Sequence, residues 1–232
     1  MMEDFRQIIT RLDPEFLATQ VRKPEGEIGK LIAHALDECN KEQIRACYQK
    51  AIQLKPKRIL EIGFGRGSYL QELLFSKRTQ LFGIDISKTM VELAVQLNPS
   101  DKINLEQGDV HSLPYEGGFF DVVLSINSVY FWKDIGVSLK EIKRVLKPNG
   151  QLILGFSPKE TLKQLSYTWS HFNHYSIDEL LNHVMEAGLK VSDITSNSHD
   201  CSTYILSAKK AGPKKNASNI QPVSLEHQHL AN

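Results

Sequence analysis

A glycine-rich segment offers the clearest chemistry in the sequence, reading EIGFGRG at 61–67. Glycines let a backbone turn tightly and approach a ligand closely, because no Cβ stands in the way. The segment follows a short apolar run at 58–62, a predicted buried strand, and precedes a predicted helix at 68–75. In a doubly wound sheet such a loop lies at the switch point of the strand order, where ligands bind. We therefore expect a ligand site around this loop.

The spacing of these glycines bears on which ligand binds. A dinucleotide fingerprint reads G-x-G-x-x-G/A, and its third small residue permits close packing of the helix. Counted from Gly63 the third position is Ser68, and counted from Gly65 it is Leu70. A P-loop would need Gly-Lys-Ser/Thr, which the segment lacks. An NAD(P)-dependent enzyme on a similar sheet stays an open but weakly supported alternative.

Four further motifs follow at the ends of predicted elements. GIDIS at 83–87 carries Asp85, which lies 85 − 65 = 20 residues after the central glycine. The other three are QGDVHSLP at 107–114, FFDVVL at 119–124 and LKEIKRVLKPNG at 139–150. In this order, and with an acidic residue two positions before the first glycine, the motifs resemble those of the class I S-adenosylmethionine (SAM)-dependent methyltransferases. The nearest type is that of ubiquinone and menaquinone biosynthesis, and the resemblance spans roughly 57–208, with Asn149 replacing a family glycine.

The resemblance implies a SAM site. It implies that Asp85 accepts hydrogen bonds from the ribose hydroxyls, and that Asp109 accepts from the adenine amine beside the Val110 amide. Glu61 is implied near the methionine amino group, and Ile86 against the adenine. The full set implied at the cofactor is Glu61, Gly63, Phe64, Gly65, Asp85, Ile86, Asp109, Val110 and Asn127.

Methyl transfer from a sulfonium is an in-line displacement with a good, neutral leaving group. Alignment of the reactants can supply up to ~7–11 kcal/mol, so no catalytic residue is obligatory. A general base would add ~10²–10⁴-fold for a hydroxyl or a protonated amine. Candidates near the expected mouth of the site are Tyr130, His171, His174 and Tyr175, which could equally form pocket wall. No cysteine or histidine spacing predicts a metal site.

Some methyl acceptors are disfavoured by the sequence. Enzymes that methylate amino groups of DNA bases or glutamine amides carry N/D-P-P-Y/F after the fourth strand, where this chain reads SINSVY at 125–130. Arsenic methylation needs several cysteines, and Cys201 stands alone in the second half. We expect a small molecule with an apolar or aromatic part, because aromatic residues follow the fourth and fifth strands: Tyr130, Phe131, Trp132, Trp169, Phe172 and Tyr175. The Arg22-Lys23-Pro24 loop is either a solvated turn or a contact for an anion.

Periodicity predicts the elements that position these residues. Apolar runs alternate with amphipathic helices, which indicates an α/β, Rossmann-like, doubly wound and mostly parallel sheet. Its seven predicted strands, the last two forming an antiparallel hairpin, are 58–62, 80–84, 102–106, 119–126, 151–156, 189–194 and 202–208. Before them, a short helix starts at Asp13-Pro14, a second covers 28–36, and a third is capped by Asn40. We expect a helical cap at 1–56, a SAM-binding domain at 57–210 and a disordered tail at 211–232.

The composition of the chain limits the kinds of binding partner and the cellular location that we expect. The 232 residues hold 28 Lys and Arg against 27 Asp and Glu, a net charge of +1 that suits no long polyanion, so no nucleic-acid partner is expected. No run of ~18 apolar residues predicts a membrane span, and the N-terminus lacks an apolar signal core. With an odd number of cysteines, a cytoplasmic location is expected. A non-catalytic SAM-fold binding protein is the third possibility; loss of Asp85 or the glycines would mark it, and they are intact.

Overall fold

The structure is a computed structural model that describes residues 12–168, 170–197 and 202–211. Its centre is a seven-stranded sheet with the strand order β3-β2-β1-β4-β5-β7-β6. The strands are β1 (Arg58–Ile62), β2 (Gln80–Asp85), β3 (Ile103–Gln107), β4 (Phe120–Ile126), β5 (Leu146–Phe156), β6 (Leu189–Ser196) and β7 (Tyr204–Lys210). Trp169, Cys201 and all but the first residue of the predicted tail lie outside the described residues.

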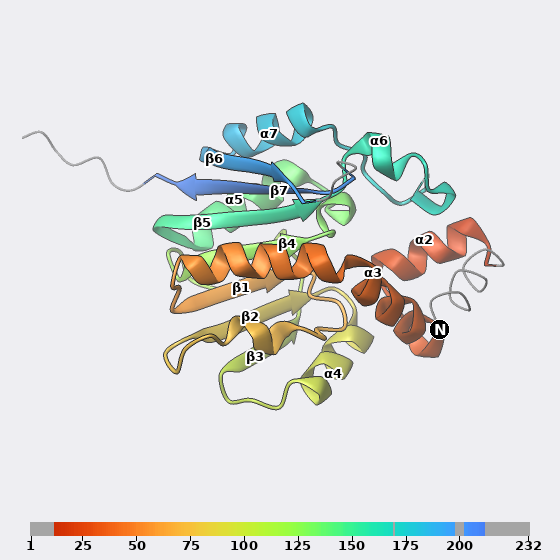
Figure 1. Cartoon of the computed structure of the whole chain (residues 1–232), viewed down its shortest axis with the longest axis horizontal. Helices are drawn as coiled ribbons and strands as arrows, with labels where there is room; N and C mark the ends of the chain where they lie inside the picture. The colour runs from red at the N-terminus through yellow and green to blue at the C-terminus, as the bar shows by residue number, and fades with distance from the viewer. Residues whose placement is uncertain (1–11, 169, 198–201, 212–232) are drawn as a thin grey trace, which may run out of the picture.

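The strand directions confirm the predicted fold. Neighbours from β3 to β5 pair in parallel, whereas β7 runs antiparallel to both β5 and β6. Figure 1 shows the strands stacked from β3 to β6 with α3 crossing in front of them. The helices of this fold are α2 (Pro14–Arg22), α3 (Gly26–Gln53), α4 (Lys88–Leu97), α5 (Ile135–Val145), α6 (Lys159–Leu162) and α7 (Ile177–Glu186), with single 3₁₀ turns η1 (Leu70–Leu73), η2 (Val129–Phe131) and η3 (Ser166–Thr168).

Both faces of the sheet are buried, which explains why its central strands read as continuous apolar runs. Successive residues of β1 point to opposite faces: Ile59 joins the apolar cluster under α3, η1 and α4, and Leu60 joins the cluster under α5 and α7. Each of these two side chains is fully buried. The strands are thereby held rigidly, and the loops at their carboxyl ends keep fixed positions.

Side-chain caps start four of the helices. Asp13 accepts a hydrogen bond from the Phe16 N–H, and Ser87 accepts one from the Met90 N–H, so α2 and α4 begin where the sequence predicts. Ser176 forms a full capping box with Glu179 at the start of α7. Each cap satisfies a backbone N–H that the helix cannot pair internally.

The N-terminal helices differ from the prediction. Asn40 does not cap a new helix, because α3 runs without a break through it. Its buried stripe continues from Ile32 to Ala51, so packing favours one long helix over two. The second half of α3 lies on the sheet with Cys47 and Ala51 in its core, whereas the first half and α2 extend beyond the carboxyl ends of the strands (Figure 1). The domain boundary at residue 56 stays a prediction, and this packing favours a boundary inside α3.

The helix predicted at 68–75 is also wrong. That segment forms only the 3₁₀ turn η1, in which Leu70 and Leu73 are fully buried. Because α3 already covers this face of the sheet, the crossover from β1 to β2 buries only a short apolar turn. Within the described part of the chain, no helix is both long and apolar enough to cross a membrane.

The packing of α3 can be tested by truncation. A chain that begins at residue 25 lacks α2 but keeps all of α3, and we expect it to unfold cooperatively. A chain that begins at residue 54 exposes the face that Cys47, Tyr48 and Ala51 cover, and we expect it to lose cooperative unfolding. Thermal melts followed by circular dichroism measure both. A cooperative melt of the shorter chain would show instead that 1–53 is an independent cap.

Candidate functional site

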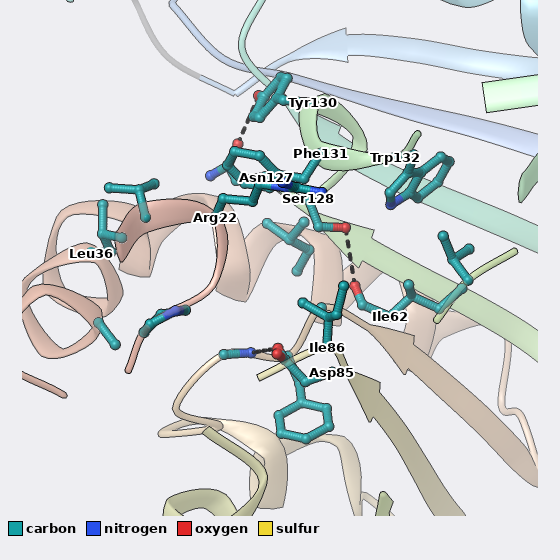
Figure 2. A pocket seen from close by; sticks show the side chains of 18 of the residues that line it. Arg22, Leu36, Ile62, Asp85, Ile86, Asn127, Ser128, Tyr130, Phe131 and Trp132 are labelled. Carbon is teal, nitrogen blue, oxygen red and sulfur yellow. Dashed lines mark hydrogen bonds between the residues drawn. The ribbon is translucent and has the colours of Figure 1, made fainter. Parts of the chain in front are cut away.

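A cavity of about 340 Å³ lies at the carboxyl ends of β1, β2 and β4. The loops after these strands form one side of it, and α2, α3 and the segment after β5 form the other. Figure 2 shows Asp85 and Ile86 at one end and Tyr130 at the other, with Leu36 of α3 facing them from the side. Every residue that the sequence placed at the cofactor lines this cavity: Glu61, Gly63, Phe64, Gly65, Asp85, Ile86, Asp109, Val110 and Asn127.

The glycine loop needs its glycines for two different reasons. Gly63 has a φ of +72°, and a Cβ there would lie 2.6 Å from the Cβ of Ser128, so the loop after β4 approaches it too closely for a side chain. Gly65 has a φ of +57°, but a Cβ there would meet nothing within 4 Å. At Gly65 the reason is therefore the positive φ and not a lack of room, because open space lies beside this residue at the cavity.

Asp85 connects the ends of β1 and β2. Its Oδ2 accepts from the Gly65 N–H at 2.8 Å, and its Oδ1 accepts from the Ser87 N–H at 2.8 Å. Asp85 is only 6% exposed. Burial raises the pKa of Asp85 to about 6, although both N–H bonds oppose the rise. A carboxylate has about four acceptor positions, so two remain for a ligand.

Two more carboxyl groups line the cavity beside Asp85. Glu61 is 4% exposed, and its Oε2 accepts from the Tyr48 hydroxyl at 2.7 Å. Burial raises the pKa of Glu61 to about 7; the Tyr48 bond opposes the rise, and the negative charges of Asp37 and Asp85 add to it. Asp37 of α3 accepts from the Ser68 hydroxyl, and burial raises its pKa as well. We did not predict Asp37, because only tertiary packing brings α3 to the glycine loop.

Asp109 lies on the loop after β3. Its Oδ1 accepts from the backbone N–H and the ring Nδ1 of His111, at 3.0 and 2.5 Å. Burial alone would raise the pKa of Asp109, but these bonds outweigh it and hold the pKa below its usual value. The His111 Nε2 accepts from the Asp134 N–H at 2.8 Å, so Nδ1 carries the ring proton and both nitrogens are used. His111 thereby ties the loop after β3 to the start of α5.

A buried polar network forms the floor of the cavity after β4. Asn127, with a φ of +51°, donates from Nδ2 to the Gln43 Oε1 at 2.8 Å. Its Oδ1 accepts from the Tyr130 hydroxyl at 3.1 Å, and that hydroxyl accepts from the Ser157 N–H. Gln43, only 3% exposed, donates to the Phe156 carbonyl at 3.3 Å. Because both ends of the Asn127 side-chain amide already make a hydrogen bond, we expect a ligand here to meet its backbone.

The four candidate bases lie in different places. Tyr130 lines the cavity, and burial raises the pKa of its hydroxyl. His171 lines a separate hollow beside α2, where its Nε2 lies 3.9 Å from the Glu15 carboxylate. His174 lies 3.4 Å from the Thr168 hydroxyl, and Tyr175 packs edge-on against the ring of His183. A role as base stays a prediction for each, but His171, His174 and Tyr175 are not among the residues lining the cavity.

The other end of the cavity is apolar and aromatic. Of the expected aromatic residues, Tyr130, Phe131, Trp132 and Phe172 line it, and the rings of Phe131 and Phe172 meet with centroids 4.6 Å apart. Tyr175 packs instead against the core under α5 and α7. Residues that the sequence did not single out complete this wall: Leu36, Ile44, Leu162, Leu165 and Tyr167. Leu36 and Ile44 reach the cavity because α3 runs as one continuous helix.

Three cationic side chains also line the cavity: Arg22, Arg66 and Lys133. Arg66 lies 2.8 Å from the His34 Nδ1 and donates to the Ser68 hydroxyl at 3.2 Å. Lys23 pairs instead with Glu25 at 3.1 Å and does not line the cavity. Among the described residues, no group of three histidine, cysteine or acidic side chains could hold a metal ion.

Comparison with known proteins shows which class of protein this chain is similar to. Residues 60–154 match the model of a methyltransferase domain family. An S-adenosylmethionine-dependent methyltransferase from Mesorhizobium loti superposes with a TM-score of 0.58 and 15% identity, over 66% of this chain and 90% of that one. That structure and this chain share the fold, and the glycine loop and the acidic residues at the ends of β1 and β2 line the cavity of this chain.

Curated relatives agree with this class. A Bacillus subtilis protein named as the uncharacterized methyltransferase YdaC is 37% identical over 103 residues, covering 44% of this chain and 57% of that protein. A malonyl-[acyl-carrier protein] O-methyltransferase from Legionella pneumophila is 31% identical over 127 residues, covering 54% and 45%. The chain thus spans about half the length of these relatives. Over the matched residues the chain is similar to methyltransferases, and its fold is that of S-adenosylmethionine-dependent methyltransferases of known structure.

Replacing Asp85 tests the cofactor site. We expect Asp85→Ala to weaken SAM binding about 100-fold, because hydrogen bonds to a charged group are worth ~1.5–3 kcal/mol each. It should also lower the melting temperature, since the Gly65 and Ser87 N–H groups lose their acceptor. Asp85→Asn keeps one acceptor oxygen and should lose less. Calorimetric titration and thermal melts measure both effects, with the exposed Asp101→Ala as control. An unchanged dissociation constant for Asp85→Ala would remove the ribose assignment.

Proposed function

We propose that this protein is an enzyme that transfers a methyl group from SAM to a small-molecule acceptor. The acidic wall formed by Asp37, Glu61 and Asp85 at the glycine loop carries the proposal. SAM brings a positive sulfonium and a positive ammonium group, and both would be attracted to these carboxyls. A nicotinamide dinucleotide brings a negative pyrophosphate, which the same wall would repel. The wall therefore favours SAM over the dinucleotide alternative.

Each cofactor group has a suitable partner along the cavity. We assign the ribose to the remaining acceptor positions of Asp85, and the methionine ammonium group to Glu61. Ile86, 39% exposed and lining the cavity, offers an apolar face for the adenine. Asp109 and the Val110 amide lie on the next loop for the adenine edge. The backbones of Gly63, Phe64, Gly65 and Asn127 complete the site.

The reaction needs mainly alignment. SAM supplies a methyl group on a sulfur that leaves as a neutral thioether. The loops after β1, β2 and β3 hold the donor, and the aromatic wall with Phe131 and Phe172 holds the acceptor and excludes water. Fixing both partners in line can contribute up to ~7–11 kcal/mol to lowering the barrier. No described residue needs to form a covalent intermediate.

The acceptor half of the cavity suits a small molecule with an apolar or aromatic part. The relative named as an O-methyltransferase supports oxygen as the methylated atom. The near-neutral net charge and the lack of an N/D-P-P-Y/F motif argue against a nucleic-acid acceptor. The described cysteines, Cys39 and Cys47, are free, which agrees with the proposed cytoplasmic location.

Binding of SAM should depend on pH. Glu61 and Asp85 have pKa values of about 7 and about 6 in the free protein, and a positive ligand binds best to their charged forms. We expect SAM affinity to rise from pH 5.5 to 7.5, because SAM binding releases the protons that these carboxyl groups hold. For each proton released, the affinity can rise by up to about tenfold per pH unit. The pKa of Glu61 is raised in the fold, so its contribution to stability is full below its unfolded value of 4.5 and is lost as pH rises through about 7. The free protein should therefore melt at a higher temperature near pH 5.5 than near pH 8.

Calorimetric titration with SAM, its demethylated product and NAD at several pH values measures this dependence. Glu61→Gln removes one titrating group and should flatten the profile, whereas Glu116→Gln, in an exposed loop, should leave it unchanged. Tighter binding of NAD than of SAM would overturn the proposed cofactor specificity. Affinity for SAM that falls between pH 5.5 and 7.5 would overturn the role of the acidic wall.

A further inference from the structure

The proton-accepting groups at the aromatic end of the cavity are occupied or protonated. The Tyr130 hydroxyl donates to Asn127 and accepts from the Ser157 N–H. Both ring nitrogens of His111 are hydrogen-bonded. Burial raises the pKa of Tyr167, so its hydroxyl stays protonated at neutral pH. Among the described lining residues, this end therefore offers no ready base.

The carboxyl groups of the cavity lie at its other end. Glu61 accepts from Tyr48, and Asp37 accepts from Ser68, which follows the glycine loop directly. The charge of Arg66 acts on Asp37 from the same loop. These carboxyls therefore face the cofactor half. An acceptor bound against Phe131 and Phe172 would have to bring a nucleophile that is already deprotonated.

Two cations line the same cavity without a hydrogen bond or ion pair to a described residue, although the charge of Arg22 acts on the Asp109 carboxylate and helps to lower its pKa. Arg22, at the end of α2, and Lys133, after η2, have no hydrogen bond or ion pair to any residue that the structure describes. In the view of Figure 2, Arg22 lies between the Asp85–Ile86 pair and the Tyr130 ring. Both side chains are exposed at its rim, where water satisfies them until a ligand binds. An anion held between them would lie beside the apolar wall.

We propose that the methyl acceptor is an amphipathic carboxylic acid, whose carboxylate is bound by Arg22 and Lys133 and whose apolar part packs against the aromatic wall. The inference rests on the proposed function and specifies its acceptor. The two cations offset the cost of bringing a carboxylate into a partly apolar cavity. Arginine suits this role, because its planar guanidinium binds a carboxylate in a fixed orientation.

The reaction balances without a proton transfer. A lone pair of one carboxylate oxygen forms the new bond to the methyl carbon as the carbon–sulfur bond breaks. The sulfur keeps the bonding pair and becomes a neutral thioether, and the carboxylate becomes a neutral methyl ester. Positive and negative charge disappear together, a change that a cavity with low polarity favours over water. The absence of a ready base at this end, within the described residues, is then no obstacle.

An acceptor panel tests the chemical class. Phenyl-substituted and straight-chain acids of graded length are compared with alcohols, phenols and amines of matched carbon skeleton, and release of S-adenosylhomocysteine is measured together with the mass of the product. We expect methyl esters of acids, and little product from matched alcohols or amines. Between pH 7.5 and 9, kcat/KM for an acid should stay flat, whereas a phenol or an amine would gain rate as it loses its proton. Failure to methylate any acid overturns the inference, and failure to bind SAM overturns the proposed function instead.

Two variants test the residues. Arg22→Gln and Lys133→Gln keep a polar side chain but remove the charge, and we expect each to raise KM for the best acid about tenfold or more. Affinity for SAM should change less than twofold, and Arg22→Lys should restore part of the loss. Lys88→Gln is the matched control, because Lys88 is exposed on α4 and does not line the cavity. Unchanged KM in both Gln variants overturns the assignment; weakened SAM binding with unchanged KM would assign Arg22 to the cofactor.

Discussion

The buried carboxylate of Asp85 is the contact on which the site depends. It holds the Gly65 N–H and the Ser87 N–H, so it fixes the loop after β1 against the start of α4. The Ser87 hydroxyl in turn donates to the Pro24 carbonyl at 2.5 Å, in the turn between α2 and α3. The side chains of Asp85 and Ser87 together connect the glycine loop to the N-terminal wall that carries Arg22. A change at Asp85 reaches the acceptor side as well as the cofactor side.

Both acidic and basic side chains line the cavity. Carboxyls gather where α3 meets the glycine loop, and their burial raises the pKa of Glu61 and Asp85 above the usual range. Such a cluster is costly to ionise in the free protein, and a ligand with positive charges recovers that cost. The exposed cations Arg22 and Lys133 also line the cavity, and the charge of Arg22 acts on the Asp109 carboxylate. In the proposed complex, the positive SAM molecule therefore binds at the carboxyl groups, and the anionic methyl acceptor binds at the two cations.

Most of the fold could be predicted from short sequence patterns, namely apolar runs and helix caps. Apolar runs ended by Gly, Asp or Pro located the strands within a few residues, and Ser87 and Ser176 capped their helices as expected. The predictions that were wrong concerned features that depend on packing between segments far apart in the sequence. Asn40 looked like a cap, but the sheet holds α3 straight through it. The burial of Asp85 could not be read from sequence either, since it follows from the backbone that folds around it.

The site divides between the part of the chain that the family model matches and the part that it does not. The matched domain, 60–154, contains the glycine loop, Asp85 and Asp109, so it accounts for the cofactor half. Much of the acceptor half lies outside that range, on α2 and α3 and in the segment after β5: Arg22, Leu36, Asn40, Ile44, Leu162, Leu165, Tyr167 and Phe172. Gln43 joins the two halves by bonding Asn127, the residue that follows β4. Because α3 is both a layer of the core and a wall of the cavity, changes on its cavity face can alter the acceptor without altering the sheet. Cofactor identity is therefore inferred from the shared motifs, whereas acceptor identity has to be inferred from charge and shape in the flanking segments.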